Sequence, residues 1–176
     1  SFFKKLNGLE ASHINYSIKY LYSLVNSGNL KEAFNYSKKL EKQKLDSFES
    51  HLVTGIFYLK NSDIDLAQKY FLKAKSKKSR FILNNFVSHS LYSWSNLDNY
   101  DLLQASLELE KIDQRFENLK KIQTVFLNCY FNSSNTNSLF EELVSNEKTD
   151  FSRYNYFYAS FAAASKKIDK AKDIVN

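Results

Sequence analysis

The stretch 48–78 places small and bulky residues in a regular order along two apolar helical patterns, separated by the polar turn 60–63. Two antiparallel helices nest closely only where a small residue on one faces a bulky residue on the other. The stretch therefore predicts a tightly packed helix-turn-helix. The residues that carry this order are Gly55, Tyr58, Ala67, Phe71 and Ala74.

The same pattern returns at a spacing of 34 residues, the distance from Ala33 to Ala67. A shared spacing across several positions indicates a repeated structural unit more strongly than any single residue does. One step back pairs Tyr58 with Leu24, Ile64 with Leu30, Phe71 with Ser37 and Ala74 with Leu40, and a second step reaches Phe3 and Leu6.

This order and period resemble the tetratricopeptide repeat (TPR), a helix-turn-helix unit of about 34 residues. The resemblance implies an all-α fold, a right-handed α-solenoid of antiparallel helix pairs. It extends over the chain as about five partly degenerate repeats, which we expect to be truncated at both ends. The predicted units are the end of an upstream repeat at 1–9, repeats at 13–45 and 47–78, degenerate repeats at 81–113 and 116–146, and a partial repeat at 151–176.

Composition agrees with a helical repeat. The 176 residues include no proline and only three glycines, which fits helices joined by short polar turns. Hydrophobic residues make up 43% of the chain, a globular rather than a disordered composition. No apolar run approaches the roughly 18 residues of a membrane span. The first residue is Ser1, so we expect the natural start to be missing, and both the cytoplasm and a bacterial envelope or periplasm stay open as compartments.

The net charge of +6 permits an anionic partner but does not require one. A solvated helix end is favoured over a nucleic-acid contact for the basic run at the end of the second repeat, because cations are favourable at a helix C-terminus. Lys38 and Glu41, on the preceding repeat, are also expected to face water. The run comprises Lys69, Lys73, Lys75, Lys77, Lys78 and Arg80.

No pattern in the chain predicts chemistry, and we expect no enzyme, no cofactor and no metal site. GxSxG, GxxxxGK[ST], GxGxxG and HExxH motifs are all missing from the sequence. Cys129 sits among apolar residues and reads as a small buried hydrophobe. Two further sets are interpreted as structural: the scattered His13, His51 and His89 as surface or seam residues, and Glu108, Glu110 and Asp113 as a solvated face.

The TPR resemblance implies a protein or peptide segment as partner, held on the concave face that the first helix of each repeat lines. Apolar side chains at Ile18, Tyr22 and Leu52 disfavour the basic clamp that some TPR proteins use for acidic tails, and an apolar or aromatic segment fits better. Tyr22 and Tyr92 have a second interpretation, packing between successive first helices. The candidate groove residues are Ile18, Tyr22, Asn26, Leu52, Ile56, Lys60, Ser88, Tyr92, Thr124, Asn128 and Tyr156.

Two other functions stay open at this point. The segment 138–175 loosely resembles a pentatricopeptide repeat, an RNA-binding unit, although the base-reading positions do not repeat and nucleic acid is therefore disfavoured. The chain could also be an accessory segment of a larger enzyme. Its loose later repeats and central Trp94 are similar to bacterial TPR proteins of envelope or assembly type, so we expect a scaffold within a larger protein or assembly.

Overall fold

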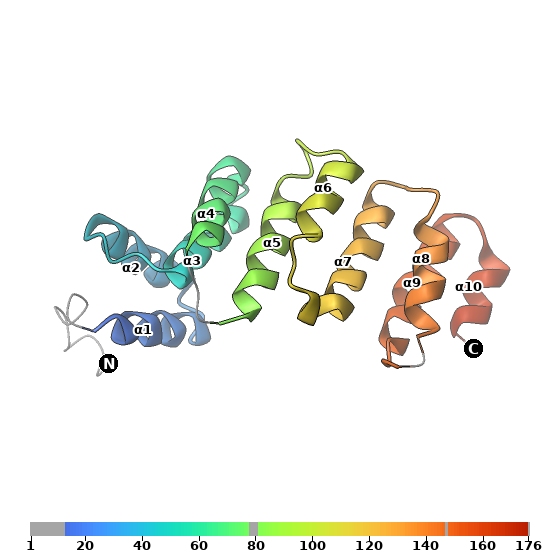
Figure 1. Cartoon of the computed structure of the whole chain (residues 1–176), viewed down its shortest axis with the longest axis horizontal. Helices are drawn as coiled ribbons and strands as arrows, with labels where there is room; N and C mark the ends of the chain where they lie inside the picture. The colour runs from blue at the N-terminus through green and yellow to red at the C-terminus, as the bar shows by residue number, and fades with distance from the viewer. Residues whose placement is uncertain (1–12, 78–80, 147, 176) are drawn as a thin grey trace. The chain divides into compact units, whose positions relative to one another are not determined.

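The computed structural model describes residues 13–77, 81–146 and 148–175, which form helices joined by turns and short irregular segments and contain no strand (Figure 1). The predicted repeat end at 1–9, with Phe3 and Leu6, lies outside the described residues. The α-helices are α1 Ile14–Asn26, α2 Leu30–Lys42, α3 Phe48–Lys60, α4 Ile64–Ser76, α5 Leu83–Ser95, α6 Leu102–Leu109, α7 Glu117–Tyr130, α8 Thr136–Val144, α9 Asn155–Ala164 and α10 Ile168–Val175, with short 3-10 helices η3 Gln114–Phe116 and η4 Ser152–Tyr154.

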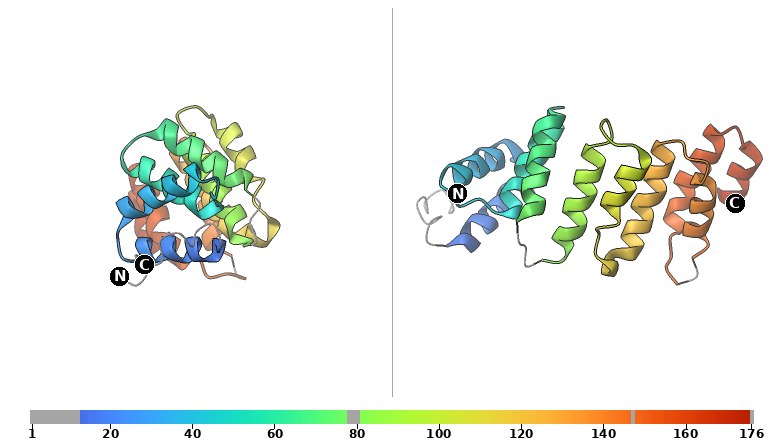
Figure 2. Two further views of the ribbon diagram at one scale, coloured as in Figure 1. Left: turned by 90° about the vertical axis from the view of Figure 1, so that its left-hand side faces the viewer. Right: turned by 45° about the horizontal axis from the view of Figure 1, so that its top comes forward.

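The chain forms two compact units, Ser1–Asp98 with α1 to α5 and Asn99–Asn176 with α6 to α10. Four of the predicted repeat ranges each contain two consecutive helices that pack on one another, as Figure 2 shows for α3 with α4 and for α9 with α10. The boundary between the units falls inside the predicted range 81–113, between α5 and α6. The pairing of these two helices, and the repeat boundaries themselves, stay predictions.

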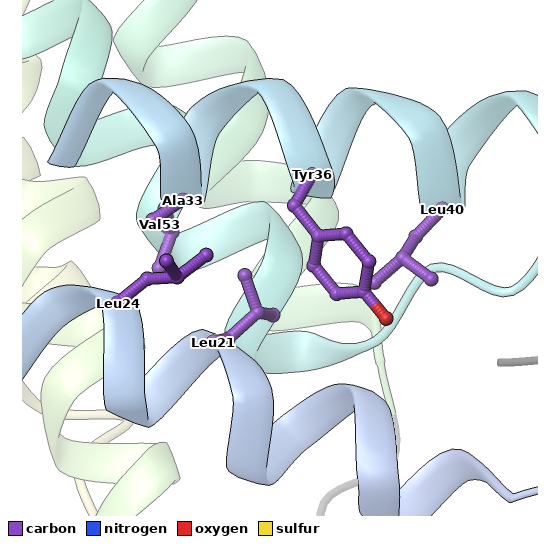
Figure 3. Packing of buried hydrophobic residues seen from close by; sticks show 6 residues of the cluster. All are labelled: Leu21, Leu24, Ala33, Tyr36, Leu40 and Val53. Carbon is purple, nitrogen blue, oxygen red and sulfur yellow. The ribbon is translucent and has the colours of Figure 1, made fainter. Parts of the chain in front are cut away.

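In the first unit, α1 and α2 meet mainly through aliphatic side chains (Figure 3). Leu21 and Leu24 of α1 point toward α2, where Ala33 and Leu40 are fully buried. Val53 of α3 joins the same cluster and links the second repeat to the first. The α1–α2 hairpin thus buries its apolar stripe partly between its own two helices and partly against α3.

Gly55 of α3 lies directly against the ring of Phe71 of α4. A Cβ atom at Gly55 would lie 2.5 Å from Cε1 and 2.6 Å from Cδ1 of the Phe71 ring, which is itself 1% exposed. Ala67 and Ala74 are buried on the same face of α4. The prediction that a small residue on one helix faces a bulky one on the other is confirmed at this pair.

One turn geometry recurs after five helices of the described residues. In the turn between α3 and α4, Ser62 N donates to Leu59 O and Asp63 N donates to Tyr58 O, each at 3.0 Å. These two bonds define the Schellman motif, in which a residue just after the helix adopts the left-handed conformation. Glycine favours that conformation, yet it occurs in only one of these five turns. The left-handed residues are Gly28 (φ 76°), Lys44 (φ 59°), Ser62 (φ 61°), Asn132 (φ 51°) and Lys166 (φ 60°).

A glutamate connects α2 to the next repeat. Glu41 accepts hydrogen bonds from Lys73 Nζ at 2.5 Å and from the Tyr70 hydroxyl at 2.8 Å, both on α4, and from Lys38. Although burial raises the pKa of Glu41, these three donors outweigh it and hold the pKa at about 2. The expectation that Lys38 and Glu41 face water is therefore wrong, because both side chains are partly covered by α4.

The second unit has the same kind of connection around a more aromatic core. Glu141 of α8 accepts from the Tyr158 hydroxyl of α9 at 3.0 Å and from Lys170 of α10 at 2.5 Å. The rings of Phe140 and Tyr158 stack with centroids 5.2 Å apart. Cys129 packs against this core and burial raises its thiol pKa, which agrees with its interpretation as a small hydrophobe.

We expect Gly55→Ala to lower the free energy of unfolding by roughly 1–3 kcal/mol, because the added methyl overpacks the Phe71 ring. The direction of the change in unfolding free energy is diagnostic, because a Gly→Ala substitution in an open helix interior instead raises that free energy by about 1 kcal/mol. Urea unfolding of Gly55→Ala, Phe71→Leu and the double variant measures the coupling. A Gly55→Ala variant that gains stability in both backgrounds would show that the two helices do not approach closely.

We expect Ser62→Gly to raise the free energy of unfolding by about 0.5–1 kcal/mol, since glycine adopts the left-handed conformation without a Cβ penalty. Ser23→Gly, at an exposed and right-handed helical position in α1, is the matched control and should lose a few tenths of a kcal/mol. Thermal and urea unfolding check both. Equal effects of the two substitutions would contradict the turn geometry.

We expect the Glu41 carboxylate to make wild-type protein more stable than Glu41→Gln at neutral pH. Between about pH 4.5 and about pH 2 the unfolded chain binds a proton at this position that the folded chain does not, so the advantage falls on acidification and is lost near pH 2. Urea unfolding at a series of pH values measures the difference. The exposed Glu32→Gln is the control, and a Glu41 effect with the same pH dependence as the control would contradict the ion cluster.

Candidate partner-binding surfaces

The exposed sides of α1 and α3 carry large apolar side chains at helical spacing. Tyr22 is 51% and Val25 43% exposed on α1, and Ile56 is 37% and Leu59 38% exposed on α3. The two helices pack against one another, so these side chains belong to one surface of the first unit. Ile18 and Leu52, one turn earlier on each helix, are half-buried. We call this set the α1–α3 surface: Ile18, Tyr22, Val25, Leu52, Ile56 and Leu59.

Four of these six residues are predicted groove residues, and two are not. Val25 and Leu59 each lie three residues after a predicted position, on the same helical face. The predicted groove residues lie at intervals of four residues along each helix, and this spacing omits Val25 and Leu59. A spacing of three residues, which also keeps to one helical face, would have included both. Asn26 and Lys60, also predicted, are exposed at the ends of α1 and α3.

Polar groups frame the α1–α3 surface. Glu49 lies in the first turn of α3 and is only 8% exposed, whereas Lys60 in the last turn is exposed. Burial raises the pKa of the Tyr22 phenol, and the negative charge of Glu49 raises it further. Glu49 therefore lies close enough to the surface for its charge to act on Tyr22.

The predicted groove residues of α5 are differently placed. Ser88 is 4% exposed and its hydroxyl donates to Asn85 O at 3.1 Å. Tyr92 is half-buried, and Lys75 Nζ of α4 lies 4.3 Å from the centroid of its ring, a cation–π contact. Tyr92 is thus in contact with α4. Its packing between successive first helices, and a contact of either residue with a partner, stay predictions.

In the second unit, Thr124 lines a half-open pocket of about 170 Å³ between α7, α8 and the end of α6. Val125, Leu139 and Leu143 form its apolar side. Lys120 at its rim pairs with Glu110 at 3.0 Å and with Glu117 at 3.2 Å. The pocket is lined by Glu110, Glu117, Lys120, Lys121, Thr124, Val125, Leu139, Glu142 and Leu143.

The other two predicted groove residues of this unit differ in exposure. Asn128 is 7% exposed and its side chain donates to Thr124 O at 2.9 Å, so it supports α7 internally. Tyr156 is 71% exposed on α9. A single groove that joins the candidate residues of both units stays a prediction.

Three lysines of the basic run are bound within the protein. Lys73 contacts Glu41, Lys77 pairs with Asp46 at 2.5 Å, and Lys75 lies over Tyr92. A solvated helix end was expected here. The side chains of Lys73 and Lys77 remain 38% and 39% exposed, although all three lysines also make contacts within the protein. Lys69 is exposed, and Lys78 and Arg80 lie outside the described residues.

Two of the titratable residues considered for chemistry, His51 and Glu108, are buried and have partners within the protein. His51 is 4% exposed and bonds to Asp46 at 2.9 Å; burial lowers its pKa, against the opposing charge of that carboxylate. Glu108, which was expected to be solvated, is instead 3% exposed and pairs with Lys111 at 2.7 Å. In the part of the chain that the structure describes, His, Cys, Asp and Glu side chains form no group of three that could hold a metal ion.

The helices within the described ranges are all too short or too polar to span a bilayer.

Two solved structures share the fold of this chain. A crystal structure of MamA matches with a TM-score of 0.60 over 86% of this chain and 88% of that one, at 13% sequence identity. MamA 41-end from Desulfovibrio magneticus RS-1 matches with a TM-score of 0.64 over 92% and 90%, at 12% identity. No protein-family model and no curated protein sequence matches the chain. The likeness confirms the predicted all-α, TPR-like helical fold, and identities this low show the fold alone.

Proposed function

We propose that this chain is a non-catalytic protein-interaction module that holds an apolar or aromatic segment of a partner protein against the α1–α3 surface. The observation that carries the proposal is the row of four exposed large apolar side chains on two adjacent helices, Tyr22, Val25, Ile56 and Leu59. Contiguous exposed apolar side chains rimmed by polar residues are typical of protein-binding sites.

The nature of these side chains favours an apolar segment over an acidic tail. Binding of a carboxylate tail needs basic and amide side chains on the same helical face, whereas Ile18, Tyr22 and Leu52 occupy it here. Tyrosine adds a large and rigid contact area that is common in binding hot spots. A helical or extended segment with aliphatic anchors is the partner that this surface accommodates best.

A nucleic-acid partner is less well supported. Lysines of the basic run that would contact phosphates, Lys73, Lys75 and Lys77, are already engaged by Glu41, Tyr92 and Asp46. Breaking these contacts would offset part of the electrostatic gain from phosphate binding.

The proposal is tested by affinity capture from a lysate of the source cell, with and without nuclease. We expect a protein that survives nuclease to be retained by the full chain and to be reduced at least about tenfold by the triple variant Tyr22→Ala, Ile56→Ala, Leu59→Ala, since central apolar anchors each contribute about 1 kcal/mol or more. A photo-reactive residue in place of Val25 should cross-link the same protein, whereas one in place of the exposed Lys42 should not.

The matched control is a triple variant at exposed leucines elsewhere, Leu72→Ala, Leu103→Ala and Leu107→Ala, which are 47%, 66% and 55% exposed. Circular dichroism establishes that both variants fold. The proposal is overturned if the two triple variants retain the protein equally, or if the retained material disappears with nuclease.

A further inference from the structure

Glu49 makes no hydrogen bond and no ion pair within residues 13–77, 81–146 and 148–175. Although the residue is only 8% exposed, its carboxylate oxygens reach solvent. The half-buried carboxylate of Glu41, by contrast, is satisfied by Tyr70 and Lys73. The carboxylate of Glu49 is therefore open to a donor that a partner supplies.

The position of Glu49 places that charge at one end of the α1–α3 surface. Glu49, Leu52 and Ile56 lie at i, i+3 and i+7 of α3, on one helical face. The negative charge also acts on the phenol of Tyr22, across on α1. The carboxylate thus lies near enough to act on the aromatic ring of Tyr22, a member of the apolar row.

The two ends of the α1–α3 surface carry opposite charges. Lys60, in the last turn of α3, lies about 16 Å further along the helix than Glu49. The positive end of the α3 dipole favours a negative charge in the first turn. A segment that crosses the surface therefore meets an acid at one end and a base at the other.

We propose that the partner segment of the α1–α3 surface carries a basic side chain, of the arginine type, that lies beside Tyr22 and pairs with Glu49. This inference rests on the proposed function of that surface and specifies its partner. A guanidinium fits because it pairs with a carboxylate through two hydrogen bonds while its flat face stacks on an aromatic ring. A guanidinium is hydrated more weakly than an ammonium, so its desolvation on binding costs less free energy.

The inference is tested by selection from a library of random peptides displayed on phage, with the full chain immobilised. Wild-type protein should select peptides that combine aliphatic or aromatic residues with arginine or lysine. Glu49→Gln, which keeps the shape of the side chain, should still select apolar peptides but lose the enrichment in basic residues. Glu49→Lys should reverse the preference toward Asp and Glu.

Calorimetry with one selected peptide measures how much Glu49 contributes to the binding affinity. Glu49→Gln should weaken its binding about tenfold or more, since loss of one member of a covered charge pair costs at least this much. Raised salt should weaken binding to wild type more than to Glu49→Gln. Glu32→Gln, the same change in the first turn of α2, is the matched control and should leave binding unchanged.

The outcomes separate this inference from the proposed function. If Glu49→Gln selects basic peptides as wild type does, or binds the peptide as the Glu32 control does, the role of Glu49 is wrong while the surface still binds apolar segments. If the variant Tyr22→Ala, Ile56→Ala, Leu59→Ala selects the same peptides as wild type, or if wild type selects none, the proposed function itself is wrong. Melting curves of the Glu49 variants establish that each compared protein is folded.

Discussion

The close approach of α3 and α4 at Gly55 and Phe71 is the constraint on which the first unit depends. A ring that meets the bare Cα of a glycine fixes both the separation and the rotation of the two helices. That rotation determines which face of α3 remains outward, and Ile56 and Leu59 are on it. The exposed apolar row is therefore a consequence of the packing on the opposite side of the helix.

Successive repeats are joined by polar contacts as well as by apolar ones. Glu41 in the first unit and Glu141 in the second each accept a hydrogen bond from a tyrosine and a lysine of the following repeat. An apolar interface alone tolerates sliding of one helix along another, whereas a carboxylate with two directed donors permits a single register. The glutamates thus supply specificity at junctions whose affinity comes from buried aliphatic and aromatic side chains.

The sequence predicts the features that repeat and misses those that cross between repeats. Ala33, Ala67 and Phe71 are buried as the 34-residue spacing requires, because helix packing imposes the same size limits in each unit. The contacts of Glu41 with α4 give no local signal, since Tyr70 and Lys73 lie 29 and 32 residues away, and only Lys38 is a local donor. The burial of Glu108 is equally invisible in a helical wheel that counts only apolar positions.

The candidate surface could be predicted only in part, for a related reason. Periodicity assigns Tyr22 and Ile56 to an outward face, but it cannot tell whether a neighbouring helix covers that face, as at Ser88. Nor does it identify Glu49, a common kind of residue for the first turn of a helix. An exposed apolar area can bind many different segments, and electrostatic complementarity provides specificity among them. A largely buried acid at the end of an apolar row therefore gives this surface a means to select one class of segment by a single interaction.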